Sequence, residues 1–126
     1  MTEPHEYRIY LDDRAIHYAI VDEEDWHYFS QWLWVPKISR GGWKMYARRA
    51  KAIWEDGVKL KTTSLYLHVE IMKRMEPPPT VFHTMVDHKN GDSLNCRRKN
   101  LRWATPRMNR MNINPRGAPA VQLEWL

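Results

Sequence analysis

The sequence predicts an α+β fold, in which small antiparallel strands and short helices come first and a strand–loop–strand–helix unit follows. Three observations support this class. Short β-rich runs alternate with short segments of helical periodicity along the first 80 residues. An Asn-Gly turn signal at positions 90 and 91 lies between two apolar runs. A Thr-Pro pair at positions 105 and 106 then marks the start of a helix.

The length fits one domain. The chain has 126 residues and a mass of 15.2 kDa, enough to bury a core without disulfides or metals. We expect a scaffold over residues 1–80, the strand–loop–strand–helix unit over 81–114 and a tail over 115–126. The single cysteine excludes a disulfide framework and a thiolate zinc site. The polar, acidic first residues and the lack of an 18-residue apolar run predict a soluble, cytoplasmic protein without membrane contact.

The first helix is expected at residues 22–33, after a strand at residues 17–21 (HYAIV). Asp22 is predicted to cap this helix, and the acids that follow suit the positive end of its dipole. Three apolar residues recur at helical spacing and are expected to face the core: Trp26, Phe29 and Leu33.

Two further elements precede the last unit. Gly41-Gly42 predicts a tight turn before a strand at residues 43–50. Residues 59–75 (KLKTTSLYLHVEIMKRM) are expected to start as a strand and to become helical near Tyr66, with prolines ending the helix. His68 falls on this segment, where a packed or hydrogen-bonded structural role is favoured over catalysis.

The last unit carries the candidate chemistry. Asp87 and His88 follow an apolar pair on an expected strand, and residues 101–103 return as a second strand. Thr105 is predicted to cap the final helix, with Pro106 at its first position.

The positive charge is confined to this end of the chain. The net charge is +5, residues 1–81 carry equal numbers of acidic and basic residues, and seven basic residues without an acid lie between Arg97 and Arg116. Such a segment indicates a polyanionic partner, most often nucleic acid. A solvated basic face without a partner is the alternative reading.

Phosphodiester hydrolysis needs a base for water and a cation for the developing charge. His88 has a suitable intrinsic pKa for the base, and Asp87 and Asn109 offer oxygen ligands to Mg²⁺ or Mn²⁺. An ideal strand would point Asp87 and His88 to opposite sides, so the strand end must be distorted for both to reach one phosphate. Asn100 is placed to hydrogen-bond the backbone around His88.

The string VDHKNGDSLNCRRKNLRWAT at residues 86–105 resembles the HNH endonuclease signature of phage and group I intron homing enzymes. The likeness extends upstream through IVDEEDWHYFSQWLW, YARRA and Leu67-His68, and covers about residues 19–112. The resemblance implies a ββα-metal (His-Me finger) site. In such a site His88 would be the general base, Asp87 a metal ligand, Asn100 the residue that orients the histidine, and Asn109 the residue that completes metal coordination. Cys96 stands where relatives often have Asn.

The function expected from this resemblance is a metal-dependent HNH DNA endonuclease that hydrolyses phosphodiester bonds by nicking or double-strand cleavage. Its partner would be double-stranded DNA, its cofactor Mg²⁺ or Mn²⁺, its state a monomer or homodimer, and its location the cytoplasm of a phage host. Phosphate contacts are expected from Arg97, Arg98, Lys99, Arg102, Arg107 and Arg110. A catalytically inactive DNA-binding protein with the same fold and an RNA-directed activity remain as alternatives.

Overall fold

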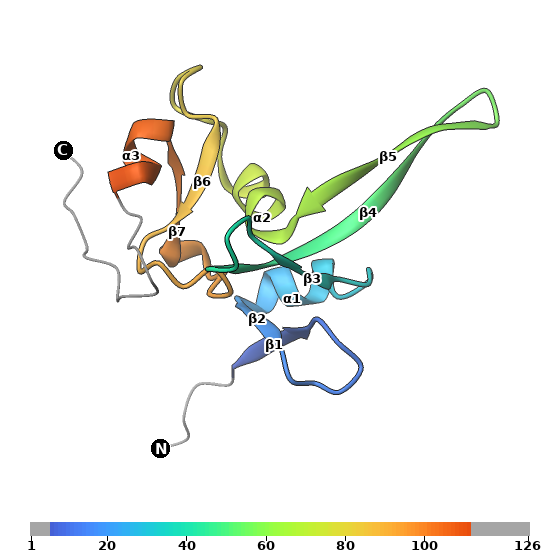
Figure 1. Ribbon diagram of the computed structural model, residues 1–126, viewed down its shortest axis with the longest axis horizontal. Coiled ribbons are helices and arrows are strands. Elements are labelled where there is room, and N and C mark those ends of the chain that lie inside the picture. The colour runs from blue at the N-terminus through green and yellow to red at the C-terminus, as the bar shows by residue number, and fades with distance from the viewer. Residues whose placement is uncertain (1–5, 112–126) are drawn as a thin grey trace.

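The computed structural model describes residues 6–111, in which seven strands and short helices alternate (Figure 1). The elements are β1 (Tyr7–Tyr10), β2 (Tyr18–Val21), α1 (Glu23–Phe29), β3 (Val35–Ile38), β4 (Met45–Glu55), β5 (Val58–Tyr66), α2 (Leu67–Met75), β6 (Met85–His88), the 3₁₀ turn η1 (Arg98–Asn100), β7 (Leu101–Ala104) and α3 (Pro106–Met111). The predicted α+β class with small antiparallel sheets is confirmed. The expected tail at 115–126 lies outside the described residues.

Three antiparallel sheets make up the strand content of the described residues: β1–β2, β3–β4–β5 and β6–β7. The β4–β5 pair is a long ribbon that projects from the body of the molecule (Figure 1). Its register shifts between Ile53 and Trp54, and such an irregularity increases the local twist of a ribbon.

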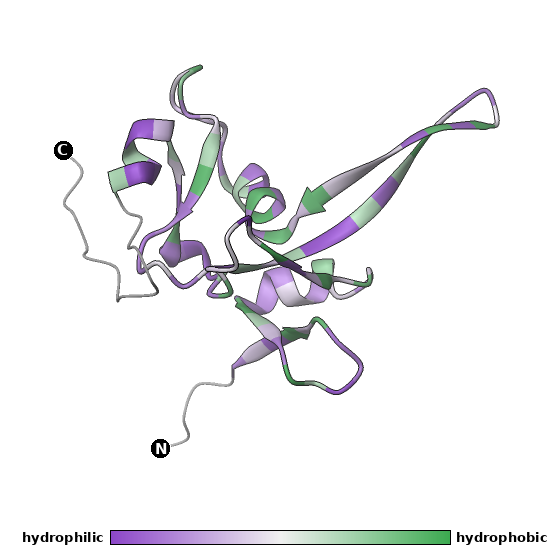
Figure 2. Ribbon diagram, in the orientation of Figure 1, coloured by the Kyte–Doolittle hydropathy of each residue, from purple (hydrophilic) through white to green (hydrophobic). Residues whose placement is uncertain are grey.

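The predicted switch from strand to helix at Tyr66 is confirmed, because β5 ends at that residue and α2 begins at the next. Helix α2 buries Leu67, Ile71 and Met72, while its last turn carries exposed basic side chains. Figure 2 shows the same division of α2 into hydrophobic and hydrophilic sides. Three prolines after Glu76 prevent its continuation.

Helix α1 is shorter than predicted, and the expected core position of Leu33 is wrong. The helix ends at Phe29, which is buried, and the side chain of Leu33 is 82% exposed. Trp34 takes the interior position instead, with an exposure of 1%, and its indole N–H donates to the Phe29 carbonyl at 2.8 Å. The chain leaves helical geometry after Phe29, so the helical spacing that pointed Leu33 inward no longer applies.

The predicted side-chain cap by Asp22 is also wrong. Asp22 occupies the N-cap position of α1, but its side chain makes no capping bond. Its carboxylate accepts instead from the backbone N–H of Arg98, at 2.8 Å. The Asp22 carboxylate therefore accepts from the distant Arg98 N–H and not from an N–H in the first turn of α1.

A second backbone connection joins the same two regions. The Ile20 N–H donates to the Leu94 carbonyl, and the Cys96 N–H donates to the Ile20 carbonyl, each at 2.8 Å. The loop between β6 and β7 is thus hydrogen-bonded to strand β2 of the N-terminal sheet.

Two local predictions for the last unit are confirmed. The chain turns at Asn90-Gly91, and Gly91 adopts a φ of 79°, a conformation that glycine permits. The Thr105 hydroxyl accepts from the backbone N–H of Met108 at 3.1 Å, which caps α3. Within residues 6–111 no helix is long and apolar enough to cross a membrane.

Candidate active site

A cleft of about 680 Å³ lies where β6 and α3 face α2 and the β3–β4 turn. It is lined by residues from six elements and the turn between β3 and β4. The lining side chains with polar or ionisable groups include Lys37, Arg40, Lys44, Tyr46, Tyr66, His68, Asp87, His88 and Asn109. Three of the four residues expected to perform or support catalysis therefore share one hollow.

His88 ends β6 and lies almost fully inside the protein, with 4% exposure. Its Nε2 atom is 3.9 Å from the Cys96 sulfur, and its ring lies 4.7 Å from that of His68 and 6.2 Å from that of Tyr46. Burial holds the pKa of His88 well below its usual value, and electrostatic interactions with His68 and Lys44 act in the same direction. The imidazole is therefore neutral at neutral pH and able to accept a proton.

Cys96 is fully buried beside this ring, and burial raises the pKa of its thiol. The group stays a neutral thiol that packs between the loop and His88.

Asp87 is equally buried and carries an ion pair. Its Oδ2 atom accepts from Nε and Nη2 of Arg102, at 3.2 and 3.0 Å. The two residues are direct partners across the β6–β7 ladder. Asp87 and His88 both line the cleft, as do the other two residues of β6.

Asn100 holds the turn that follows His88. Its Oδ1 accepts from the Asn90 N–H at 3.1 Å, and its Nδ2 donates to Asn90 Oδ1 at 3.0 Å and to the Asn95 carbonyl at 2.8 Å. Its backbone carbonyl accepts from the Lys89 N–H at 2.7 Å. These contacts hold Lys89 and Asn90, the two residues that follow His88.

Asn109 reaches the cleft from α3. The helix packs against β6 and β7, and the Asn109 N–H donates to the Thr105 carbonyl at 3.0 Å. The capped first turn of α3 therefore determines where the Asn109 side chain lies.

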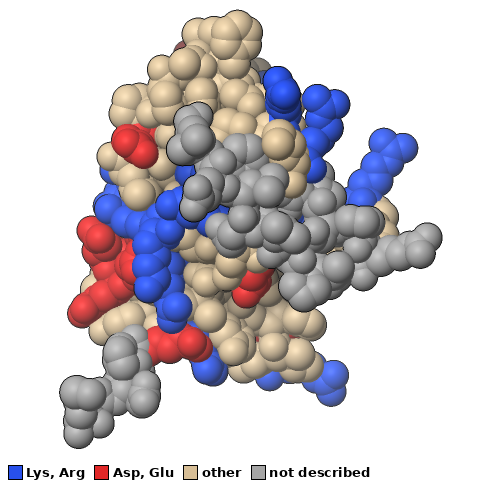
Figure 3. Space-filling model, turned by 90° about the vertical axis from the view of Figure 1, so that its left-hand side faces the viewer, with Lys and Arg blue, Asp and Glu red and all other residues tan. Residues whose placement is uncertain are grey.

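Two of the six residues expected to contact phosphate form ion pairs with buried carboxylates. Arg98 pairs with the fully buried Asp25 through two bonds, at 3.0 and 2.9 Å, and this hydrogen bonding raises the pKa of Arg98. Arg102 binds Asp87, as described above. Figure 3 shows basic side chains lying against acidic ones on this side of the molecule, with further basic side chains standing apart.

The other four basic residues are half-buried or exposed. Arg97 is half-buried and lies 3.8 Å from a carboxylate oxygen of Glu6. Lys99, Arg107 and Arg110 are exposed, the last two on α3.

The sequence reasoning missed the basic residues that line the cleft itself. Lys37, Arg40 and Lys44 come from β3 and the turn that follows it. The signal was present, because Arg40 and Lys44 flank the Gly41-Gly42 turn, but nothing local showed that this turn faces β6. His68 was assigned to packing, and it also lines the cleft.

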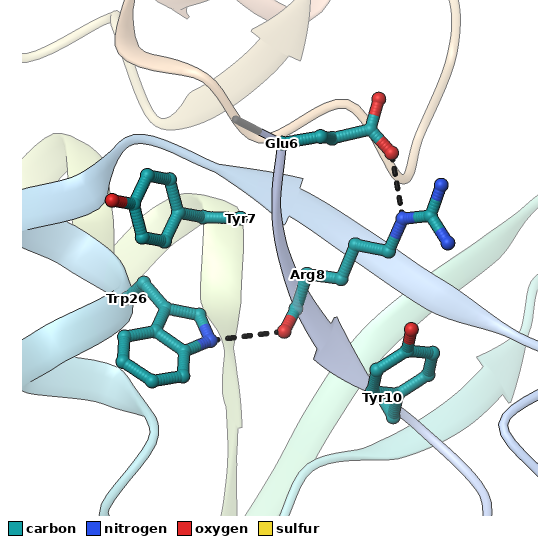
Figure 4. A pocket seen from close by; sticks show the side chains of 5 residues that line it. All are labelled: Glu6, Tyr7, Arg8, Tyr10 and Trp26. Atoms are coloured by element: carbon teal, nitrogen blue, oxygen red, sulfur yellow. Dashed lines mark hydrogen bonds and ion pairs between the residues drawn. The ribbon is translucent and has the colours of Figure 1, made fainter. Parts of the chain in front are cut away.

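A second hollow, of about 490 Å³, lies beside β1 and carries less chemistry (Figure 4). Its polar groups bond to one another: Arg8 donates to Glu6 at 2.7 Å, and the Trp26 indole donates to the Arg8 carbonyl at 3.0 Å. The remaining lining side chains are tyrosines. We therefore place the candidate active site in the larger cleft.

The donors in the larger cleft fit a hard divalent cation. Asp87 supplies a carboxylate and Asn109 an amide, which are oxygen ligands of the kind Mg²⁺ and Mn²⁺ take. No group of three His, Cys, Asp or Glu side chains within residues 6–111 is arranged to hold a metal. A magnesium ion is commonly held by one or two carboxylates together with substrate phosphate and water.

The unit formed by β6, β7 and α3 is a ββα arrangement that brings a histidine, an aspartate and an asparagine to one cleft. Residues 79–111, which span this unit, match the family model of the HNH endonucleases. Over residues 79–111 the resemblance seen in the sequence is confirmed, and these residues form an HNH motif; the likeness upstream of them stays a prediction. No curated protein and no solved structure matches the chain.

Proposed function

We propose that this protein is a divalent-metal-dependent DNA endonuclease that hydrolyses phosphodiester bonds at the cleft between β6, α3, α2 and the β3–β4 turn. The observation that carries the proposal is the convergence of His88, Asp87 and Asn109 in one hollow that Lys37, Arg40 and Lys44 make positive. A phosphodiester is an anion, and cations in a cleft raise its local concentration.

His88 is the general base of this proposal. A neutral, buried imidazole accepts a proton from the attacking water as the water oxygen bonds to phosphorus. One phosphorus–oxygen bond breaks, and the leaving oxygen takes a proton from solvent. Asn100 acts through the backbone after His88, so we assign it as a positioning residue.

Asp87 and Asn109 would hold the metal. When bound, such an ion supplies Lewis-acid stabilisation of the negative charge that develops on the phosphate. Asp87 would share its carboxylate between the ion and Arg102, whose guanidinium already holds one of the carboxylate oxygens.

The proposed DNA surface extends outward from the cleft. We assign phosphate contacts to Lys37, Arg40 and Lys44 inside it, and to Arg97, Lys99, Arg107 and Arg110 outside it. Arg98 and Arg102, which were expected to bind phosphate, are proposed instead to hold Asp25 and Asp87.

From the resemblance we further propose that the enzyme is of the homing type and cleaves double-stranded DNA. We propose Mg²⁺ or Mn²⁺ as its ion. It would act as a monomer or homodimer in the cytoplasm of a phage host. One HNH motif in the chain supports cleavage of one strand at a time, so double-strand cleavage would require two copies or two visits.

The alternative is a DNA-binding protein without catalysis. One observation favours it: Arg102 already neutralises the carboxylate that a metal would need.

A plasmid-nicking assay with Mg²⁺ or Mn²⁺ distinguishes the two functions. We expect the wild-type protein to nick, and His88→Ala to lose about 10²–10⁴-fold in rate while binding DNA as before. Exposed His27, replaced by Ala, is the matched control and should cleave normally. DNA binding without nicking by the wild-type protein would favour the alternative.

A further inference from the structure

His68 is a buried imidazole without a hydrogen-bond partner in the described chain. It is the second residue of α2 and only 8% exposed. No hydrogen bond or ion pair within residues 6–111 uses either of its ring nitrogens. Among the buried and half-buried side chains of that range, Arg49 Nε is the sole fully buried nitrogen or oxygen without a partner, so the His68 nitrogens still touch solvent in the cleft.

Ring contacts hold the imidazole in one orientation. His68 stacks on Tyr46, with centroids 5.3 Å apart and planes at 29°, and lies 6.0 Å from the Tyr66 ring. Its other neighbour is His88, at 4.7 Å. A polar ring held rigidly beside the proposed base is what a preorganised contact to substrate requires.

Packing alone does not explain a histidine here. The ring contacts do not require the ring nitrogens, since a phenyl ring would stack on Tyr46 equally well. His68 lines the cleft together with His88 and the cations of the β3–β4 turn, and the proposed substrate phosphate would bind in this cleft.

We propose that His68 is a further catalytic residue, whose neutral ring donates an N–H to a non-bridging oxygen of the scissile phosphate. The proposal rests on the nuclease function proposed above. The proton stays on His68 throughout: the bond strengthens as charge builds on that oxygen, while His88 takes the proton of water. Burial lowers the pKa of His68 to about 4, which keeps the ring in this neutral, donating form.

The first test compares variants at position 68 on a DNA duplex whose cut position has been mapped. His68→Phe keeps the ring contacts and removes the donor, so we expect its single-turnover rate to fall by about 10²-fold, with DNA affinity unchanged. His68→Gln restores a donor and should recover part of the rate. His27→Phe replaces an exposed histidine and should cleave as the wild type does. Cleavage by His68→Phe within about two-fold of wild type would overturn the proposal.

The second test begins with the wild-type protein. Sulfur replaces each non-bridging oxygen of the scissile phosphate in turn, because sulfur is a poorer acceptor than oxygen. We expect one diastereomer to be cleaved slowly in both Mg²⁺ and Mn²⁺, since a lost hydrogen bond is not restored by a more thiophilic ion. This slow diastereomer should lose its penalty in His68→Phe. Equal rates for both diastereomers in Mn²⁺ would contradict the proposed contact.

Failure of the two proposals can be told apart. If the wild-type protein cleaves no DNA, the nuclease function is overturned and the role of His68 with it. If the wild-type protein cleaves and the variants at position 68 match it, the role of His68 alone is overturned.

Discussion

Two histidines, His68 and His88, lie side by side in the cleft, and both are held neutral by burial. A histidine whose pKa is lowered in the folded state contributes stability that is present above its unfolded pKa of about 6.5. That contribution is lost as the pH falls from there towards the folded pKa, which is about 4 for His68. Acid should therefore destabilise this protein well before its carboxylates are protonated.

Because both histidine pKa values are lowered, the stability of the protein should fall as the pH falls. Between pH 6.5 and 5 each of the two histidines should lower the free energy of unfolding by up to about 1.4 kcal/mol per pH unit. His68→Phe removes one of these contributions, so the slope over that range should fall by about half. Urea unfolding at several pH values measures the slope, with His27→Phe as the control. An unchanged slope in His68→Phe would show that His68 is not held neutral.

The Arg98–Asp25 pair gives a second prediction at this scale. Arg98→Ala leaves the carboxylate of Asp25, which is fully buried, without its guanidinium, and the loss should be about 3–5 kcal/mol in the free energy of unfolding.

Arg97→Ala is the matched control for this change. Its partner Glu6 lies 3.8 Å away on the surface, so less than about 1 kcal/mol should be lost. In Arg97→Ala, the slope of log DNA affinity against log salt concentration should instead become shallower by about one unit. This change is not expected of Arg98→Ala. Equal stability of the two variants would contradict the structural role of Arg98.

At the scale of the element, the cap of α3 matters because the helix has only six residues and carries Asn109. Thr105→Ala removes the hydroxyl that accepts from Met108 and should cost about 1 kcal/mol. The first turn would then fray, so the Mg²⁺ concentration that supports half-maximal cleavage should rise. Thr105→Ser keeps the hydroxyl and should behave as wild type. A metal requirement that Thr105→Ala leaves unchanged would mean that the cap does not position Asn109.

Local sequence signals predicted several elements well. The Thr105 cap, the Asn90-Gly91 turn and the change from strand to helix after Tyr66 depend on residues within one or two turns of chain. The resemblance in residues 86–105 added the ββα order of strands and helix. Contacts between residues that are close in the sequence could therefore be predicted.

One wrong prediction and one unforeseen ion pair come from contacts between distant segments. Asp22 was expected to cap its own helix, but its carboxylate binds a backbone N–H 76 positions away. Basic charge between Arg97 and Arg116 suggested one DNA-binding face, yet Arg98 satisfies a buried acid from α1. No periodicity or turn signal encodes which acid meets which base across the fold, so these assignments needed the structure.

At the scale of the whole molecule, the cleft belongs to no single segment. His88 and Asn109 come from the HNH motif, whereas Tyr46 and Lys44 come from β4 and the turn before it, and His68 from α2. The motif contributes the proposed base and metal ligands, and the preceding chain supplies most of the walls.

The prediction at this scale concerns residues 79–111 alone. This fragment lacks β2 and α1, which bind its loop, and a two-stranded sheet with one short helix is too small to bury a core. We expect it to show no fixed tertiary signal in near-ultraviolet circular dichroism and no nicking activity, under conditions where the full chain shows both. A folded, active fragment would mean that the scaffold is dispensable.

The pairing of Asp25 with Arg98 also bears on how the protein folds. The two residues are 73 positions apart, so the chain must close a long loop before this contact stabilises anything. Until Arg98 arrives, burying α1 against the N-terminal sheet would bury an unpaired carboxylate. The first strands and helix therefore do not form a stable unit ahead of the motif, and both regions are expected to order in one cooperative step. If α1 opens locally, Arg98 and the loop beside His88 lose their contacts at the same time. Unfolding of this distant helix would therefore also disorder the wall of the cleft.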